Sequence, residues 1–370
     1  MRRRKSGSNA GPKSSRKTSR QRILNDFPAK LRRLVLERSP MLFRPSRIQL
    51  FLGATTATLL MVASNAAQAQ TFGVGVNSDP NLGVVASASS GDTTFTINAG
   101  TDQVSKSGNG ARISSGSARG KVTVSCASGA CTGKKVQVRV GVSGSPTGRA
   151  RALTGFNVAS GTLAVSSVSG TNPLTFVINS FPAGGGYFWL GATYPIAGDD
   201  SGKATGAAGS GFAISAVLSG KSFGAGTGST ADATVYRKLS IVNDTPLSFG
   251  RIVRPTSGSS TATFSATNPQ RVITGSGVWL NTPSPTRAKY TITGEGGAAV
   301  SLSIPPSFTM TGPSTLTVTT DTTAQGAPVL SSITGNAGTY SFYVGGAMTL
   351  TSSTPSGAYS GSYVVTVSYN

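Results

Sequence analysis

Residues that could support catalysis are few in this chain of 370 residues, because it has no histidine and only 11 Asp and Glu. Neither a Ser-His-Asp nor a Cys-His arrangement can form without histidine, and histidine ligation of a metal is excluded. Asp199 and Asp200 are the sole adjacent acidic pair. Such a pair can bind a hard cation, but Asp beside Gly is also typical of a solvated turn, the interpretation we prefer. We therefore expect no catalytic residue, no metal, no cofactor and no enzymatic activity.

The two cysteines predict a disulfide. Cys126 and Cys131 enclose Ala-Ser-Gly-Ala between two segments with strand character. A hairpin there would bring their Cα atoms within the roughly 4.4–6.8 Å that a disulfide spans. We expect the bond to form in an oxidising compartment and to contribute about 2 kcal/mol, because the loop it closes is short. Two thiolates without histidine are too few for a metal site.

Basic residues are concentrated in one region, because nine Lys and Arg and no acid lie between Gln103 and Gly198. This predicts a positive field. Within 135–142, valines alternate with charged or small residues, so one face would be buried and the other exposed. The candidate polyanion-binding residues are Lys121, Lys134, Lys135 and Arg139, with acidic glycans as the expected partner. A solvated outer face is the ordinary alternative.

Three successive aromatic residues, Tyr187, Phe188 and Trp189, could include a platform for a sugar ring. Successive strand residues point to opposite faces, so at least one of the three belongs in the core.

Residues 1–69 combine a basic leader with an export signal. An uncharged apolar run at 50–63 is followed by Ala67-Gln68-Ala69, the small-x-small pattern that a signal peptidase accepts. We expect cleavage after Ala69, since a membrane span needs about 20 apolar residues and this run is shorter. Met41 would open a signal peptide of ordinary proportions and is an alternative start. A nucleic-acid partner is not expected, because the basic leader stands in front of an export signal.

The remainder of the chain predicts strands throughout. Only 12% of the residues are charged, and 48 Gly and 19 Pro supply turns. Alternating runs occur at Val122–Cys126, Val136–Val142, Leu174–Ile178, Tyr187–Leu190, Phe212–Leu218, Val235–Val242, Arg287–Thr293, Val300–Ile304, Leu316–Thr320, Tyr340–Val344 and Tyr363–Tyr369. The pattern favours an all-β protein of two Ig-like antiparallel β-sandwich domains.

An internal repeat supports the number of domains. The segment RGKVTVS at 119–125 matches RAKYTIT at 287–293, with both basic residues in the same places. Two further matches follow in the same order, 188–192 with 342–346 and 201–206 with 356–361. We therefore expect a basic N-terminal domain at 70–230 and a second domain at 231–370, with the seam in or just after Ser219–Ser229.

The second domain resembles a known bacterial family. The four blocks that carry the resemblance are LSIVNDTPLSFGRIV at 239–253, YTITGE at 290–295, FYVGG at 342–346 and GAYSG at 357–361. Together they are similar to the family called domain of unknown function 4402. The resemblance implies an exported β-sandwich of unestablished activity, with an architecture similar to fimbrial subunits. The first domain departs from the pattern, because it lacks the Leu-Ser-Phe-Gly block.

The last fourteen residues resemble the terminal signature of chaperone-usher pilus subunits, with a Gly fourteenth from the end and a penultimate Tyr. The residues of this candidate assembly strand are Gly357, Tyr359, Tyr363, Val365, Val367 and Tyr369. An ordinary last core strand is the alternative. Near the other end, Phe72, Val74 and Val76 alternate with Gly and Asn, so they could form a short donor strand or belong to a disordered N-terminus.

These observations predict an exported structural or adhesive surface protein, in its sharper form a fimbrial or tip-adhesin-like subunit assembled by β-strand addition. Its expected partners are a periplasmic chaperone and like subunits, and its expected location is the periplasm, the cell surface or the medium. An outer-membrane β-barrel is one alternative. A secreted glycan-binding or carboxylate-dependent glycan-active protein is the other.

Overall fold

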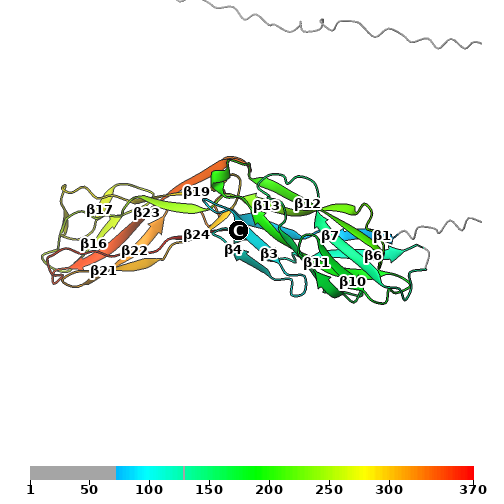
Figure 1. Ribbon diagram of the computed structural model, residues 1–370. Helices are drawn as coiled ribbons and strands as arrows, with labels where there is room; N and C mark the ends of the chain where they lie inside the picture. The colour runs from blue at the N-terminus through cyan, green and yellow to red at the C-terminus, as the bar shows by residue number, and fades with distance from the viewer. Residues whose placement is uncertain (1–71, 128–129) are drawn as a thin grey trace, which may run out of the picture. The chain divides into compact units, whose positions relative to one another are not determined.

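The computed structural model describes residues 72–127 and 130–370, and these described residues belong to one compact unit (Figure 1). The predicted leader and its cleavage site at Ala69 lie outside the described residues. Within the described part of the chain, no helix has the length and apolar character needed to cross a membrane. The regular structure is almost wholly β, which confirms the predicted fold class.

Strands β1–β13, which we call the N-terminal half, form two sheets. One has the order β1-β6-β11-β3-β4 with β8 beside β11, and the other has the order β5-β2-β13-β12-β7-β10-β9. The bounds are β1 Phe72–Ser78, β2 Asn81–Ala86, β3 Thr93–Ile97, β4 Val104–Ser107, β5 Ala111–Arg112, β6 Gly120–Cys126, β7 Val136–Val142, β8 Gly155–Ser160, β9 Ser166–Ser169, β10 Leu174–Ile178, β11 Gly186–Ile196, β12 Gly206–Leu218 and β13 Thr227–Tyr236. A single 3-10 turn, η1 Asp199–Ser201, lies between β11 and β12. The pairs are antiparallel except that β13 runs parallel to β2.

The N-terminal half is held by one continuous core between its two sheets. Val136, Val138 and Val140 of β7 are fully buried, and alternate residues of β6 and β10 face them from the other strands. Period-two alternation therefore buries one face of each strand, as the sequence pattern requires. The predicted bounds of β7 and β10 agree with the structure to the residue.

Strands β14–β24, the C-terminal half, form a larger sheet and two small ones. The larger sheet has the order β14-β19-β23-β16-β17 with β21 and β22 alongside, and the small sheets are β15-β18 and β20-β24. The bounds are β14 Ser240–Thr245, β15 Ile252–Val253, β16 Ser259–Phe264, β17 Arg271–Ile273, β18 Val278–Trp279, β19 Ala288–Glu295, β20 Val300–Ser303, β21 Ser307–Thr311, β22 Thr315–Thr322, β23 Ala337–Thr351 and β24 Thr366–Tyr369.

The two halves repeat one topology. The order β1-β6-β11-β3-β4 in the first corresponds strand by strand to β14-β19-β23-β16-β17 in the second. The repeated motif RGKVTVS forms β6 and its counterpart forms β19, the second strand of each sheet. In the second layer, the pair β2-β5 corresponds to β15-β18, and the pair β7-β12 corresponds to β20-β24. The two halves thus share one strand order in the larger sheet and similar strand pairs in the second layer.

The boundary between the halves lies later than the sequence pattern indicated. The predicted run Val235–Val242 is divided, because β13 ends at Tyr236 and β14 begins at Ser240. β13 pairs with β12 and β2, so the Gly/Ser-rich stretch Ser219–Ser229 runs from a hairpin loop into a strand of the N-terminal half and is not a linker. Strand pairing therefore moves the boundary from 230/231 to the residues after Tyr236.

The start of the described chain is a strand of the N-terminal half. Phe72, Val74 and Val76 pack on the core, and β1 pairs antiparallel with β6 from Phe72↔Cys126 to Val76↔Val122. The expectation of a disordered N-terminus is wrong for these residues. The other expectation, a free donor strand, is wrong as well, because the strand is already paired within its own half.

Candidate functional site

A groove of about 1110 Å³ lies open in the C-terminal half between two stretches of backbone, 246–254 and 354–363. The first stretch is paired along its other edge, through Ser248↔Thr286 and the β15-β18 pair. The second is paired along its other edge through Thr311↔Ser360. Each stretch therefore presents an edge to the groove that pairs with no strand of the described residues.

Core residues form the walls and floor of this groove. Leu247, Phe249 and Ile252 come from one wall, and Tyr359 and Tyr363 from the other. The apolar residues of the floor are Phe308, Met310, Leu316, Met348 and Leu350. All of the floor residues belong to one hydrophobic cluster of the C-terminal half, so the groove opens directly onto its core.

The N-terminal half shows what occupies the equivalent place. There β13 lies between β2 and β12, parallel to β2 and antiparallel to β12. Its inward residues Ala231, Ala233 and Val235 are at most 5% exposed and join the single core cluster of that half. In the C-terminal half, the stretch 246–254, which includes β15, and the stretch 354–363, which leads into β24, line the two sides of the groove, and no described strand lies between them. The core there is correspondingly divided into two clusters.

The terminal segment, residues 357–370, lines one side of this groove with its residues 357–363, and from Tyr363 onward it alternates as predicted. Tyr363, Val365, Val367 and Tyr369 are half-buried against the core, and the residues between them are exposed. Hydrogen-bonded strand is shorter than predicted, because β24 covers only Thr366–Tyr369. Opposite the earlier part of the terminal segment, β20 is followed by Pro305 and Pro306, which have no N–H to donate.

Gly357 has a structural reason to be glycine. Its φ is 157°, and a Cβ at this position would lie 2.4 Å from the Cγ atom of Pro313. Its neighbour Tyr359 packs on the cluster below the groove and donates a hydrogen bond to the Pro355 carbonyl at 2.7 Å. The two predicted residues therefore fix the path of the chain along one rim of the groove.

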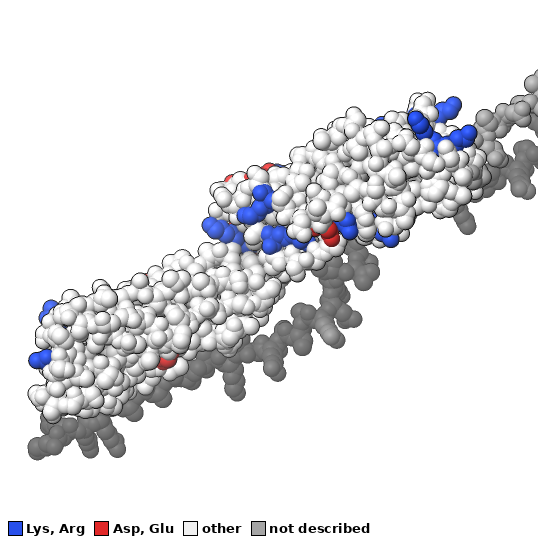
Figure 2. All heavy atoms as spheres, turned by 90° about the horizontal axis from the view of Figure 1, so that it is seen from below, with Lys and Arg blue, Asp and Glu red and all other residues white. Residues whose placement is uncertain are grey.

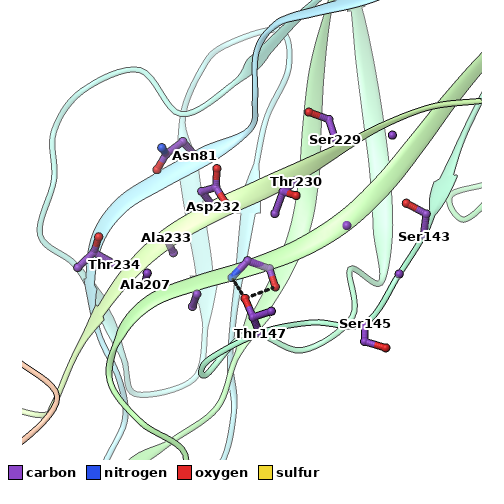
Figure 3. Close-up of a pocket in the computed structure, with 15 residues that line it drawn as sticks. Asn81, Ser143, Ser145, Thr147, Ala207, Ser229, Thr230, Asp232, Ala233 and Thr234 are labelled. Atoms are coloured by element: carbon purple, nitrogen blue, oxygen red, sulfur yellow. Dashed lines mark hydrogen bonds between the residues drawn. The ribbon is translucent and has the colours of Figure 1, made fainter. Parts of the chain in front are cut away.

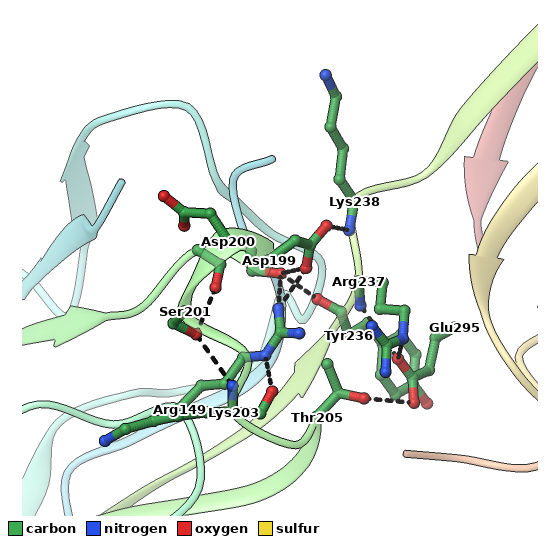
Figure 4. Close-up of polar contacts among 12 residues, drawn as sticks. Arg149, Asp199, Asp200, Ser201, Lys203, Thr205, Tyr236, Arg237, Lys238 and Glu295 are labelled. Carbon is green, nitrogen blue, oxygen red and sulfur yellow. Dashed lines mark hydrogen bonds and ion pairs between the residues drawn. The ribbon is translucent and has the colours of Figure 1, made fainter. Parts of the chain in front are cut away.

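The penultimate Tyr369 connects the terminal segment to the junction between the halves, where Thr205, Arg237 and Glu295 lie close together (Figure 4). Its hydroxyl donates to the Arg237 carbonyl at 2.9 Å and accepts from the Glu295 N–H at 2.7 Å. The Glu295 side chain is fully buried and accepts from Thr205 Oγ1 at 2.8 Å and from the Arg237 N–H at 3.2 Å. This network joins side chains of both halves with the backbone between them.

The acidic pair at 199–200 is occupied by protein donors. Asp199 accepts hydrogen bonds from Ser87 Oγ and the Lys238 N–H, and it forms an ion pair with Arg149, which is 1% exposed. Asp200 accepts from the Gly91 N–H. These contacts give both carboxylates a structural role at a turn, and no group of three potential metal ligands occurs among the described residues.

The predicted disulfide is present, with 6.2 Å between the Cα atoms of Cys126 and Cys131. The expected hairpin is not, because β6 and β7 belong to different sheets. The bond therefore closes a connection between the two layers of the sandwich, and Cys131 is part of the core.

The four candidate polyanion residues do not form one patch. Lys121 lies on the outer face of β6 and Arg139 on the outer face of β7, and these strands belong to opposite sheets. Lys134 and Lys135 are exposed in the turn before β7. On the face drawn in Figure 2, the Lys and Arg side chains are scattered over a largely uncharged surface.

The positive field that the sequence predicted for residues 103–198 is also reduced, because acidic residues from outside this range pair with its arginines. Arg149, Arg151 and Arg119 pair with Asp199, Asp92 and Asp102, respectively.

The aromatic trio divides as the strand rule requires. Phe188 is fully buried, and Tyr187 and Trp189 stand on the outer face of β11. There Lys121 lies over the Tyr187 ring and Arg119 over the Trp189 ring, at 4.3 Å and 3.8 Å from the centroids. These cations occupy ring faces on which a sugar would stack.

The groove residues Leu247, Phe249 and Ile252 had no role in the sequence prediction. The signal was visible, since all three residues lie in the block 239–253, one of the four that carried the family resemblance. The motif alone could not show that the backbone of 246–254 has an unpaired edge.

Comparisons with known proteins give few matches. No curated protein matches the chain. Among solved structures, a match covering 80% of this chain and 99% of the other is the CsuC-CsuE chaperone-tip adhesion subunit pre-assembly complex from archaic chaperone-usher Csu pili of Acinetobacter baumannii. The sequence identity is 11% and the TM-score is 0.25.

The family comparison concerns the half that holds the groove. The described groove walls, 246–254 and 354–363, both fall inside the matched region. Residues 239–369 match the family described as Domain of unknown function (DUF4402), which confirms the resemblance carried by the four sequence blocks.

Proposed function

We propose that this chain is an exported structural or adhesive surface protein, a fimbrial or tip-adhesin-like subunit, whose C-terminal half is completed by a β-strand of another protein. The observation that carries the proposal is the groove between 246–254 and 354–363, which lies where β13 completes the N-terminal half. Two strand edges above an apolar floor are what a backbone-pairing ligand requires.

The mode of binding follows from the internal template. An incoming strand would run parallel to 249–254 and antiparallel to the terminal segment, as β13 does beside β2 and β12. Its backbone would bond to both edges, and alternate apolar side chains would enter the groove. A periplasmic chaperone could supply such a strand before assembly and a like subunit after it.

The same arrangement supports a place at one end of an assembly. The first described residues, in β1, are already paired with β6, so they are not free to complete a neighbour. With export and cleavage after Ala69, only two residues would precede β1. The subunit would then accept a strand without donating one.

Supplying the strand in cis tests this proposal. The chain is extended after Asn370 by a short Gly-rich linker and a copy of residues 227–236, the sequence of β13. Burying several apolar side chains should raise the melting temperature by roughly 5–10 °C relative to the unextended chain. The matched control carries Asp at the three positions copied from Ala231, Ala233 and Val235. Equal melting temperatures for all three proteins would contradict the proposal.

A further inference from the structure

A second hollow, of about 680 Å³, lies on the N-terminal half between the outer faces of β12 and β13 and the loop 143–147 (Figure 3). Its lining is made of small and polar residues, among them Asn81, Thr147, Gly209, Gly211, Thr230 and Asp232. Asp232 is the sole charged residue in this lining, which contains neither a cation nor an aromatic ring. The hollow is separate from the groove, with which it shares no residue.

The wall of the hollow is held in place by backbone hydrogen bonds. Ser143 N–H donates to the Gly211 carbonyl at 3.0 Å, and Thr147 N–H donates to the Gly209 carbonyl at 2.8 Å. In return, Gly209 N–H donates to Thr147 Oγ1 at 3.1 Å (Figure 3). The loop 143–147 is therefore ordered without a ligand, so binding would not incur the entropic cost of ordering it.

The depth of the hollow depends on glycine at its floor. A Cβ on Gly209 would lie 2.8 Å from Thr230 Cγ2, 3.3 Å from Asp232 Oδ1 and 3.4 Å from Thr147 Oγ1. On Gly211 it would lie 2.2 Å from the Ser143 carbonyl oxygen. A side chain at either position would thus occupy the hollow or displace its wall.

A carboxylate and an amide stand side by side at one edge. Asp232 is the partner of Asn81 in the β13-β2 register. Asn81 Oδ1 accepts from the Gly83 N–H at 2.7 Å, so the amide nitrogen is the group that remains available as a donor. Asp232 is exposed at the mouth, yet partial desolvation of its carboxyl group and the charge of Asp79 raise its pKa. Thr230 and Ser145 supply hydroxyls farther across (Figure 3).

We propose that this hollow binds a neutral sugar unit of a glycan, with neighbouring hydroxyls of one ring shared between the Asp232 carboxylate and the Asn81 amide. A sugar presents closely spaced hydroxyls that both donate and accept, and the lining offers an acceptor-only carboxylate beside an amide donor and several hydroxyls. The absence of Lys and Arg from the lining disfavours an acidic sugar, and its lack of large side chains disfavours an apolar ligand. One carboxylate is too little for a cation.

Amide NMR shifts of the full mature chain provide the test. The probes are the methyl glycosides of glucose, galactose, mannose and N-acetylglucosamine, with the methyl glycoside of N-acetylneuraminic acid as the acidic comparison. We expect at least one neutral glycoside to shift the amides of Gly209, Gly211 and Thr230 saturably at millimolar concentration. Asp232→Asn should weaken this binding roughly tenfold or more, because a hydrogen bond to a charged group is lost.

Two further variants separate binding from folding. Ala207→Trp, on the exposed floor, should abolish binding by filling the hollow, and Asp92→Asn removes a carboxylate elsewhere and should leave the affinity unchanged. The proposal is overturned if no neutral glycoside gives saturable shifts at these amides, if Asp232→Asn leaves the affinity unchanged, or if the acidic glycoside binds more tightly. The groove plays no part in these measurements.

Discussion

Tyr369 ends the alternating pattern of the terminal segment, and its hydroxyl also makes two hydrogen bonds to the backbone. Its hydroxyl bonds to the backbone at Arg237 and Glu295, and burial, with the nearby charges of Glu295 and Asp199, raises its pKa to about 12. The unfolded pKa is about 10. Because the folded value is higher, its contribution to stability is complete below pH 10 and is lost as the pH rises to 12.

Tyr369→Phe therefore has two expected effects. At pH 7 the variant should lose about 1–3 kcal/mol of unfolding free energy, since two backbone groups lose their partner. Between pH 10 and 12 its stability should fall less steeply than that of the unsubstituted chain. Urea unfolding at a series of pH values measures both effects. An equal slope in the two proteins would show that Tyr369 is not a source of the alkaline dependence.

Asp232 is the residue at which stability and the proposed binding oppose each other. Its pKa is raised by desolvation and by Asp79, so the folded chain holds this proton more tightly than the unfolded chain does. The favourable contribution is present at low pH and is lost as the pH rises through the folded pKa. At pH 7 the ionised carboxylate therefore costs stability.

Asp232→Asn should consequently raise the melting temperature at pH 7 and reduce the change in stability between pH 6 and pH 4. Thermal unfolding across that range measures the effect, with Asp92→Asn as the control for removal of an exposed charge. A variant less stable than the unsubstituted chain at pH 7 would contradict this assignment.

Among the elements, the link between β6 and β7 shows which features residues close in sequence can predict and which depend on residues far away in the chain. The cysteine spacing predicted the disulfide correctly, but a hairpin was expected because the two flanking runs are close in sequence. The choice of sheet depends on pairing partners far away: β6 pairs with β1 and β11, and β7 pairs with β10 and β12. The residues between 120 and 142 therefore do not determine which sheet each strand joins.

Replacing both Cys126 and Cys131 by Ser should lower the free energy of unfolding by roughly 2 kcal/mol, because the closed loop is short. Treatment of the unsubstituted chain with a reductant should lower it by a similar amount and should leave the double variant unaffected. Equal stability of oxidised and reduced chains would contradict a stabilising role.

Strands with strict inward valines or phenylalanines were predictable from sequence, as β7 and β10 illustrate. Strands whose sequences offer little apolar signal were missed or misplaced: β9 is three serines and one valine, and two of the three inward residues of β13 are alanines. The terminal strand was overextended, because Pro305 and Pro306 in its partner, and not its own residues, limit the pairing. The groove could not be predicted, since an unpaired edge is a property of two segments about a hundred residues apart.

At the scale of the whole molecule, the strand order shared by the two halves indicates which kind of element would fit the groove. One half of the chain closes its sandwich with β13, and the other presents the same two flanking edges without such a strand among the described residues. The hydroxyl of Tyr369, at the end of the terminal segment, donates a hydrogen bond to the Arg237 carbonyl in the backbone that joins the halves. A strand bound in the groove would therefore contact the terminal segment, whose other end bonds to the junction through Tyr369.

Amide hydrogen exchange on the chain alone and on the chain extended by the β13 copy tests the central claim most directly. In the chain alone, amides that face the groove within 249–254 and 357–363 should exchange rapidly. In the extended chain, both stretches should become protected together, because the added strand bonds to each edge. Slow exchange at both edges in the chain alone, or no added protection in the extended chain, would show that the groove is not a site for an incoming strand.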